Sequence, residues 1–378
     1  MNKKLFVRAI ALLLCFVMIF TLSACKKKAQ EENSAASEVS AAEPTAEPTS
    51  KPTPEPTPEP TPDPEVIPEK ASLLTGLETL TDEAVGKRPV AVMINNVAPA
   101  LPQDGVGSAE ILFEIPIEYE HTRLLGVFSD YTKIPKICSV RSCRYYFPIV
   151  AAGFDAIYVH WGIDEVYARP VLNALGIEAF DGVRGGLGFY RDQNRLNKGY
   201  ALEHTGYMDG SKFPEMVEKK GFRMDLKEDW EGYAFNFAKM DEVVTPAGET
   251  ADYVKIDFGA QNSTFNYDPE TKLYSKMHNR NKHIDALSGE QLTFTNVVVL
   301  ETDITFKPNQ VHREINLTGG ENYKGYYFSN GAMQEIYWSK EGDFEKFKFF
   351  NKDGTELVMN RGKTYIAINY PNRITLTK

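Results

Sequence analysis

A proline-rich segment near the start of the chain confines the folded part to the last 308 residues. Ten of the 22 prolines lie between Pro44 and Pro68, in the near-repeat TPEPTPEPTPDP with Ala, Ser and Glu around it. Such a segment has almost nothing to bury, so it is expected to be disordered or to form polyproline II. At about 3.1 Å per residue, residues 42–64 could extend about 70 Å. We predict a tether over residues 25–70. The alternative, a peptide docked by a partner domain, lacks aromatic and basic anchors.

Residues 1–24 have the pattern of a secretory signal peptide with a lipoprotein ending. Lys3, Lys4 and Arg8 precede or enter an apolar run over residues 5–22, and the sequence LSAC closes it. A basic start, a short apolar run and small residues before a cysteine are typical of such signals. Cys25 would become the first residue of the mature chain and carry lipid such as palmitate on its thiol. The alternative is an uncleaved anchoring helix, since 18 residues are at the lower edge of membrane-spanning length. Both alternatives anchor the protein to the cell membrane on its extracytoplasmic face.

The charge of the mature chain excludes one class of partner. Without the three basic residues of the signal, 39 basic residues stand against 52 acidic ones, a net charge of −13. A protein this acidic is not expected to bind nucleic acid or an anionic membrane surface non-specifically. Any site for an anion must therefore be local.

Two cysteines remain in the folded part, Cys138 and Cys143. An extracytoplasmic compartment permits a disulfide between them. Cysteines in such apolar surroundings are more often buried as small hydrophobic residues. The sequence leaves both states open and favours free thiols.

The folded part predicts a mixed α+β protein, with an N-terminal α/β domain built on a central sheet over residues 71–242. Apolar runs typical of strands alternate there with runs compatible with helices, for which Asp164 and Ser211 are candidate N-caps. This alternation favours a central sheet with helices packed on it. The predicted strands cover 88–96, 109–119, 122–130, 133–140 and 154–162, and the predicted helices cover 145–154, 164–177 and 211–222.

Residues 243–378 predict a smaller, β-rich C-terminal domain. Aromatic and β-branched runs are broken there by Asn330-Gly331 and Asp353-Gly354. Asn-Gly and Asp-Gly are the strongest short signals for β-hairpins. The boundary between the two domains is placed within residues 243–252.

Several motifs, in this order along the chain, resemble the YerB-like lipoprotein family. They are LLTGL, RPVAVMINN, TRLLGVF, SVRSCRYYF, DAIYVHWG, FYRD and YSKMHNRNKHIDALSGEQLTFTNVVVL. The resemblance covers almost all of residues 73–378 and implies a two-domain extracytoplasmic lipoprotein, but no activity is established for that family. The chain departs from the family pattern at Tyr119-Glu120-His121 and at Glu203-His204-Thr205, which puts the flanks of any site near His204 in doubt.

The stretch KICSVRSCRYYF is the first candidate for a ligand site. Arg141 and Arg144 stand beside Ser139 and Ser142 where a strand-like run gives way to a predicted helix. Arginine offers a planar fork for phosphate or carboxylate, and a helix N-terminus offers free N–H groups. The alternative is that both arginines form structural ion pairs in an acidic protein.

The stretch RGGLGFYRDQNR is a second candidate. Arg184, Arg191, Asp192 and Arg195 occur there with three glycines, which would let the backbone approach a ligand closely. The pattern matches neither a P-loop nor a dinucleotide fingerprint. It predicts either a ligand loop, with Arg191 and Asp192 in contact with the ligand, or a mobile surface loop.

His160 ends a predicted strand, where α/β folds often open onto a ligand crevice. With Asp164 it forms a candidate acid/base pair, because a histidine with a carboxylate partner is the usual arrangement for proton transfer. His204, Asn95 and Asn96 are further candidates for ligand contacts in the same crevice. The alternative is that these groups only satisfy one another.

Other chemistries have no sequence signature here. The zinc helix, the paired Cys-x-x-Cys, the nucleophile elbow and the EF-hand loop are missing. We therefore expect no metal and no cofactor. His278 and His283 have basic neighbours and are read as part of the surface of the β-rich domain.

Three functions remain open. The first is binding of an anionic, phosphate-bearing ligand of the cell envelope, a polymer or its precursor, through an arginine-lined crevice. The second is an envelope enzyme of phosphoryl or glycosyl transfer or hydrolysis, in which His160 moves a proton. The third is a scaffold for wall or membrane proteins. Binding is favoured, because the chain spells no complete catalytic constellation, and whether it is an enzyme stays undecided.

Overall fold

The computed structural model describes residues 67–377, and the predicted signal peptide, Cys25 and most of the tether lie outside this part. The described residues belong to one compact unit. Within the described residues, no helix is both long enough and apolar enough to cross a membrane.

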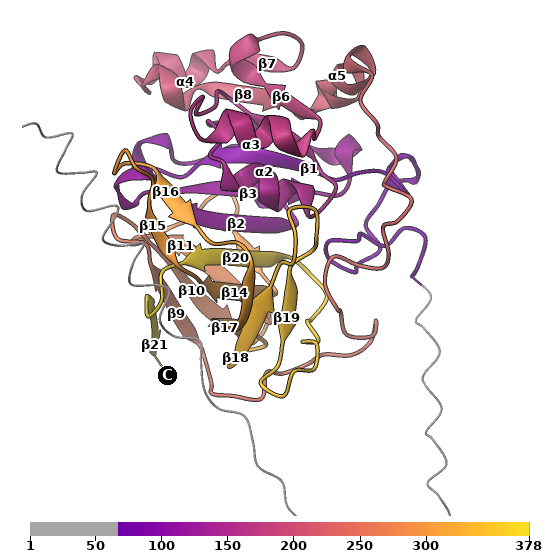
Figure 1. Ribbon diagram of the computed structural model, residues 1–378, viewed down its shortest axis with the longest axis vertical. Helices are drawn as coiled ribbons and strands as arrows, with labels where there is room; N and C mark the ends of the chain where they lie inside the picture. Colours follow the sequence, from indigo (N-terminus) through magenta and orange to yellow (C-terminus); the bar gives the residue numbers. More distant parts are fainter. Residues whose placement is uncertain (1–66, 378) are drawn as a thin grey trace, which may run out of the picture. The chain divides into compact units, whose positions relative to one another are not determined.

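The predicted mixed fold is confirmed (Figure 1). The N-terminal half contributes β1 (Val90–Asn95), β2 (Ile111–Pro116), β3 (Thr122–Phe128), β4 (Lys136–Cys138), β5 (Ile157–His160), β6 (Ala179–Asp181), β7 (Phe189–Arg191) and β8 (Gly206–Asp209). Its helices are α2 (Tyr146–Ala152), α3 (Ala168–Leu175), α4 (Gln193–Asn197) and α5 (Phe213–Lys220).

The C-terminal half is β-rich, as predicted. Its strands are β9 (Tyr253–Asp257), β10 (Asn262–Asp268), β11 (Leu273–His278), β12 (Asn281–Lys282), β13 (Thr293–Phe294), β14 (Asn296–Glu301), β15 (Ile304–Phe306), β16 (Arg313–Ile315), β17 (Gly319–Ser329), β18 (Ala332–Ser339), β19 (Lys348–Phe350), β20 (Thr364–Asn369) and β21 (Ile374–Thr377). β17 and β18 form the predicted hairpin, in which Asn330 and Gly331 both have positive φ, 48° and 73°. That geometry is typical of the tight hairpin turn that Asn-Gly favours.

One sheet of ten strands runs through both halves, in the order β19-β18-β17-β14-β20-β2-β3-β1-β5-β6. The two halves meet where β20 pairs in parallel with β2, with Ile111 opposite Thr364 and Glu114 opposite Ala367. The predicted boundary, residues 243–252, lies in the connection between α5 and β9. Figure 1 shows the sheet continuing from the indigo strands of the N-terminal half into the yellow β20.

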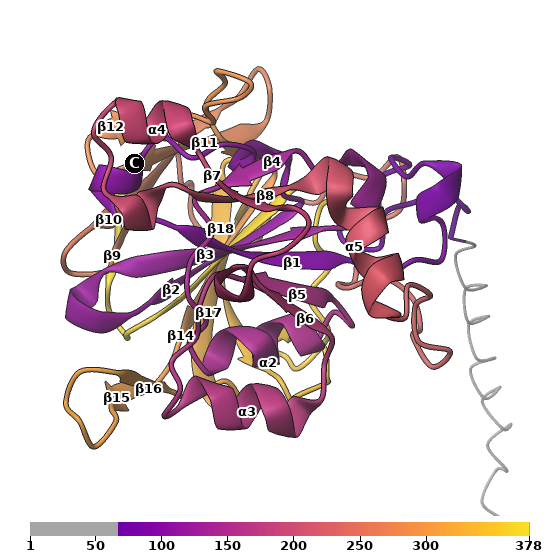
Figure 2. The same cartoon turned by 90° about the horizontal axis from the view of Figure 1, so that it is seen from above.

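Both faces of this sheet are buried, which explains the continuous apolar runs of its strands. In β1, Ala91 and Met93 face a core that includes Phe147 of α2, while Val92 and Ile94 face a second core. Figure 2 shows α2 and α3 on one side of the sheet, and the small sheet β4-β8-β7 on the other. A further sheet, β12-β11-β10-β9-β21, packs against the second core, to which Val254 and Phe265 belong.

Candidate functional site

The two arginine-bearing segments of the sequence meet at Trp161. The carbonyl of Arg141 accepts the N–H of Trp161 at 2.9 Å. The guanidinium of Arg191 lies over the Trp161 ring, 4.5 Å from its centroid. Arg191 also stands opposite Gly206 in the β7–β8 pair, and the carbonyl of Gly206 accepts the N–H of Val140 at 2.8 Å. The segments that carry Arg141 and Arg191 therefore lie side by side.

Arg144 forms a structural ion pair, the alternative to an anion site that the sequence left open. Its Nη2 donates to Oε2 of Glu118 at 3.0 Å, and its Nε donates to Oε1 of the same carboxylate. Burial favours the neutral acid, but hydrogen bonding to Arg144 lowers the pKa of Glu118. Neither Ser139 nor Ser142 caps α2, which begins after Tyr145 without a side-chain cap. The predicted anion cradle at a helix N-terminus is therefore not formed here.

Arg123 is the residue that the sequence reasoning missed. It is 4% exposed and lies on β3 opposite Asn95 of β1. Its Nη1 donates to the carbonyl of Ser142 at 2.5 Å, and its Nε is buried without a partner in the described structure. Burial, and then the positive charges of Arg144 and Arg141, lower the pKa of Arg123 to about 9. A guanidinium stays protonated at neutral pH, so this shift marks a buried charge that is poorly compensated.

We call Arg123, Arg141, Arg144 and Arg191 the arginine cluster. Ion pairs join Arg144 to Glu118 and Arg141 to Glu203, at 3.1 Å for the latter, whose side chain is 57% exposed. Arg123 and Arg191 form no ion pair with any residue between 67 and 377. The Nε of Arg141 and the Oγ of Ser139 are also buried without a partner among these residues. The cluster thus holds surplus positive charge and unused hydrogen-bond donors.

Asn95 and His204 border the cluster, and their side chains form a hydrogen bond with each other. Asn95 Nδ2 lies 3.0 Å from Nδ1 of His204, and both residues are buried. The amide donates in this contact, so Nδ1 accepts and the proton of the neutral ring is assigned to Nε2. Burial lowers the pKa of His204, although the carboxylate of Glu203 opposes the shift.

Asn96 belongs to a different place, a fully buried polar network around Glu114 and Lys276. Asn96 Nδ2 donates to Oε1 of Glu114 at 2.9 Å. Lys276 Nζ lies 3.3 Å from Oε2 of Glu114, and both side chains are inaccessible. The same ammonium contacts Ser263 Oγ at 2.7 Å and Nδ1 of His283 at 3.1 Å. We call this the Glu114–Lys276 network. It joins the two halves of the chain.

The interpretation of His278 and His283 as surface residues is wrong. They are 3% and 1% exposed, because β10 and β11 pack their inner side against the ten-stranded sheet. His283 Nε2 lies 2.8 Å from Gln103 Oε1. Both nitrogens of His278 lack a partner in the described structure.

His160 and Asp164 do not form the predicted pair. His160 Nδ1 lies 2.8 Å from the carbonyl of Gly162, and the carboxylate beside it, 3.8 Å away, is that of Asp181. Asp164 Oδ2 lies instead 2.8 Å from Nε2 of His312, on the turn that joins β15 to β16. Asp181 is the parallel-strand partner of His160 across β5 and β6, a relation that only the strand order reveals.

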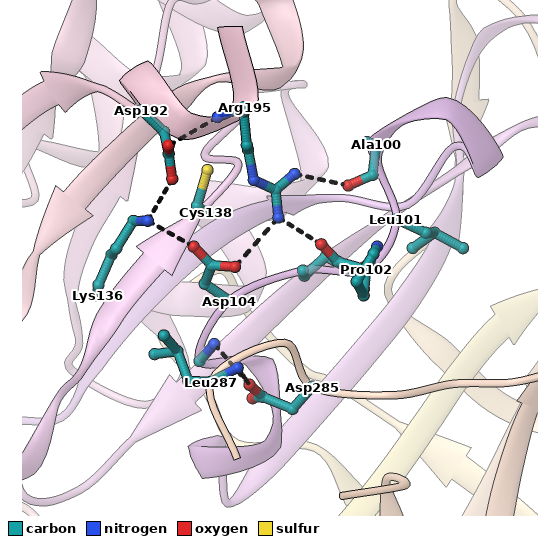
Figure 3. Close-up of polar contacts among 12 residues, drawn as sticks. Ala100, Leu101, Pro102, Asp104, Lys136, Cys138, Asp192, Arg195, Asp285 and Leu287 are labelled. Atoms are coloured by element: carbon teal, nitrogen blue, oxygen red, sulfur yellow. Dashed lines mark hydrogen bonds and ion pairs between the residues drawn. The ribbon is translucent and has the colours of Figure 1, made fainter. Parts of the chain in front are cut away.

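Asp192, predicted to contact a ligand, stabilises the local fold (Figure 3). Its Oδ1 accepts the N–H of Arg195 at 2.9 Å and so caps α4. Lys136 Nζ bridges Asp192 and Asp104, at 2.7 Å from the latter. Arg195 Nη1 in turn donates to the carbonyl of Ala100 at 2.9 Å.

The same region brings Asp104, Asp192 and the thiol of Cys138 within 4.8 Å of one another. Lys136 contacts both carboxylates, and Arg195 Nη2 lies 3.2 Å from Oδ1 of Asp104, so two cations balance the two carboxylates without a metal ion. Cys138 and Cys143 are free thiols, as favoured from the sequence. Burial raises the pKa of each to about 12. Buried, protonated thiols of this kind are poor nucleophiles.

Comparisons with known proteins give a family and no activity. Residues 74–223 match a model described as the N-terminal domain of a protein of unknown function, DUF3048, and residues 254–366 match the corresponding C-terminal domain. The chain is 29% identical over 308 residues to "Putative lipoprotein YerB" of Bacillus subtilis (strain 168), covering 78% of this chain and 85% of that protein. The crystal structure of YerB from Bacillus subtilis superimposes with a TM-score of 0.69 at 26% identity, covering 81% of this chain and 98% of that one. The chain therefore belongs to the DUF3048 family, whose N-terminal and C-terminal domain models both match it, and it is homologous to the Bacillus subtilis YerB protein.

Proposed function

We propose that this protein is a lipid-anchored extracytoplasmic protein that binds a phosphate-bearing ligand of the cell envelope at the arginine cluster. The sequence LSAC before residue 26 and the lipoprotein name of the Bacillus subtilis relative support the anchor at Cys25. The long proline-rich segment would give the folded part reach within the envelope.

The main support for this binding site is that the buried Arg123 lacks a carboxylate partner among the described residues. A buried cation without a carboxylate partner is costly, and Arg123 has only a backbone carbonyl as acceptor within the described residues. An oxyanion between Arg123 and Arg141 would supply the missing charge and accept hydrogen bonds from the two unused Nε groups. Charge-assisted hydrogen bonds to arginine suit phosphate, because its oxygens match the planar fork.

Two exposed side chains border the proposed site. Arg191 is exposed and lies over Trp161, so its guanidinium can contact an incoming anion. Glu203 pairs with Arg141 but is largely exposed. Exposed ion pairs are weak, so a phosphate can displace Glu203 at little cost. The negative charge of the ligand would thus balance the positive charge of the arginine cluster that no carboxylate among the described residues balances.

The test is thermal unfolding of the full-length protein in detergent with inorganic phosphate, pyrophosphate and phosphorylated wall fragments. A ligand at 100 times its dissociation constant stabilises the folded state by about 2.7 kcal/mol. An Arg141→Ala, Arg191→Ala variant should lose this stabilisation. An Arg280→Ala, Arg373→Ala variant removes the same charge elsewhere and should keep it. No stabilisation by any phosphate, or equal loss in both variants, would contradict the proposal.

A further inference from the structure

A separate cavity opens at the carboxyl ends of β5 and β6, beyond the arginine cluster. It has a volume of about 390 Å³ and is lined by residues of α3, of the glycine-rich loop after β6 and of the end of α5. His160 and Asp181, the last residues of β5 and β6, are partners across these two strands, and both line the cavity. In α/β sheets, ligands bind preferentially outside the carboxyl ends of parallel strands.

The polar lining of this cavity is cationic. Arg184, Lys219 and Lys220 are exposed, line the cavity, and form no ion pair with the residues that the structure describes. Arg169 also lines it but is held by Glu165 at 2.8 Å. The carboxylate of Asp181 is engaged as an acceptor for the N–H groups of Gly162 and Val183, at 2.8 and 3.0 Å. Three cations therefore remain available to an anionic ligand.

His160 offers the cavity a group of the opposite kind. Its Nδ1 is bonded to a carbonyl, which can only accept, so this nitrogen carries the proton of the ring. Burial lowers the pKa of His160, although Asp181 opposes the shift, so the ring is neutral at pH 7. Nε2 is then a hydrogen-bond acceptor, and it has no partner within residues 67–377. A phosphate oxygen, itself an acceptor, would not satisfy it, whereas a hydroxyl would.

The rest of the lining is apolar. Leu172, Phe180, Phe189 and Met216 contribute to it. Such a wall suits the carbon skeleton of a polyol or a sugar, which combines C–H groups with hydroxyls.

We propose that this cavity is a second binding site, which takes a phosphate ester of a polyol or sugar. Arg184, Lys219 and Lys220 contact the phosphate, and His160 Nε2 accepts a hydrogen bond from a ligand hydroxyl. This site does not depend on the arginine cluster, because the two share no residue. Its ligand can be a free phosphate ester or the end of a polymer that repeats the same unit.

Titration calorimetry of the full-length protein in detergent tests this site with three probes: glycerol 3-phosphate, methyl phosphate and a short glycerol phosphate oligomer. Methyl phosphate keeps the anion but lacks the hydroxyls. One net hydrogen bond is worth about 1 kcal/mol, so glycerol 3-phosphate should bind about 5-fold to 10-fold more tightly than methyl phosphate. Tighter binding of the oligomer than of the monomer would support the site with a polymer as the source, and equal or weaker binding would support it with a free ester as the source.

Two variants separate the roles of the residues. The double variant Lys219→Ala, Lys220→Ala should bind every probe about 10-fold more weakly. The matched control Lys198→Ala, Lys282→Ala removes two exposed lysines outside the cavity and should leave the affinities unchanged. His160→Phe should bring the ratio between glycerol 3-phosphate and methyl phosphate close to one. Because this change also removes the contact to Gly162, folding is checked by circular dichroism, and Arg184→Ala, at an exposed position, provides a second variant that should weaken all probes.

The outcomes distinguish this site from the arginine cluster. Binding that survives Arg141→Ala, Arg191→Ala but is weakened by Lys219→Ala, Lys220→Ala supports the cavity. Binding that is lost only in the arginine variant overturns the cavity and leaves the proposed function standing. An unchanged ratio in a folded His160→Phe variant overturns the role of the hydroxyl. No binding of any probe to the parent protein overturns the site.

Discussion

Buried positive charge is compensated in opposite ways at Lys276 and at Arg123. Both residues are almost inaccessible, 0% and 4% exposed. Lys276 contacts the carboxylate of Glu114 and two further partners. Arg123 has a backbone carbonyl and a buried Nε without a partner in the described structure. Because a buried charge must be paired to be tolerated, the difference supports a structural role for Lys276 and agrees with the ligand role that we propose for Arg123.

The strongest way to test the Lys276 half of this comparison is Lys276→Met. This change leaves the carboxylate of Glu114 buried without its cation. Removing one partner of a buried ion pair costs about 3 to 5 kcal/mol, so the free energy of unfolding measured with urea should fall by about that amount.

The control for this variant removes both charges at once. In Glu114→Gln, Lys276→Met no uncompensated charge is left, and most of the lost stability should return. If the single variant loses less than about 1 kcal/mol, or if the double variant is no more stable than the single one, the network does not hold the two halves together as described.

A smaller effect is expected from His278, beside the same network. Burial, and then the positive charge of Lys276, lower the pKa of His278 to about 4, while Glu114 opposes the shift. In the unfolded chain the His278 ring binds a proton below about pH 6.5, whereas in the folded protein the same ring stays neutral down to about pH 4. Stability should therefore fall as the pH drops through this window, by about 2 kcal/mol at pH 5.

His278→Phe checks this assignment. It keeps a ring against His283 and removes both unpartnered nitrogens. Urea unfolding at pH 7 and pH 5 should then show a smaller difference between the two conditions than in the parent protein. A difference of the same size would show that other groups cause the acid sensitivity, with His283 the next candidate, because burial holds its pKa well below 6.5.

Local features of the sequence predicted most elements of the fold. The apolar runs at 88–96, 122–130 and 154–162 became β1, β3 and β5, because a sheet buried on both faces needs apolar residues at every position. Asn330-Gly331 became a hairpin because its turn requires positive φ. The parallel pairing of β2 with β20 joins positions about 250 residues apart in sequence, and no local pattern encodes such a contact.

Local sequence patterns also predicted only those site residues whose positions do not depend on the pairing of distant strands. Arg141 and Arg191 were proposed from two local motifs, and the segments that carry them do meet at Trp161. Arg123 was not proposed, because it starts an apolar run and only the pairing of β3 with β1 places it beside Asn95. His160 was identified by its place at the end of a strand. Its neighbour Asp181 depends on strand order, whereas nearness in sequence favoured Asp164.

The smallest expected change in stability, and the sharpest test of the comparison, comes from Arg123→Met. If the role of Arg123 is to bind an anion, its charge does not stabilise the protein in the absence of that ligand. The free energy of unfolding of the ligand-free variant should therefore stay within about 1 kcal/mol of the parent value or rise. Stabilisation by phosphate should be lost. Arg144→Met is the matched control, since it removes the arginine partner of the buried carboxylate of Glu118 and, among the side chains that the structure describes, leaves it only the contact with His312, at 3.3 Å; this change should destabilise the protein clearly. If Arg123→Met instead costs as much as Lys276→Met, Arg123 is a structural residue after all, and the two buried cations do not differ in kind.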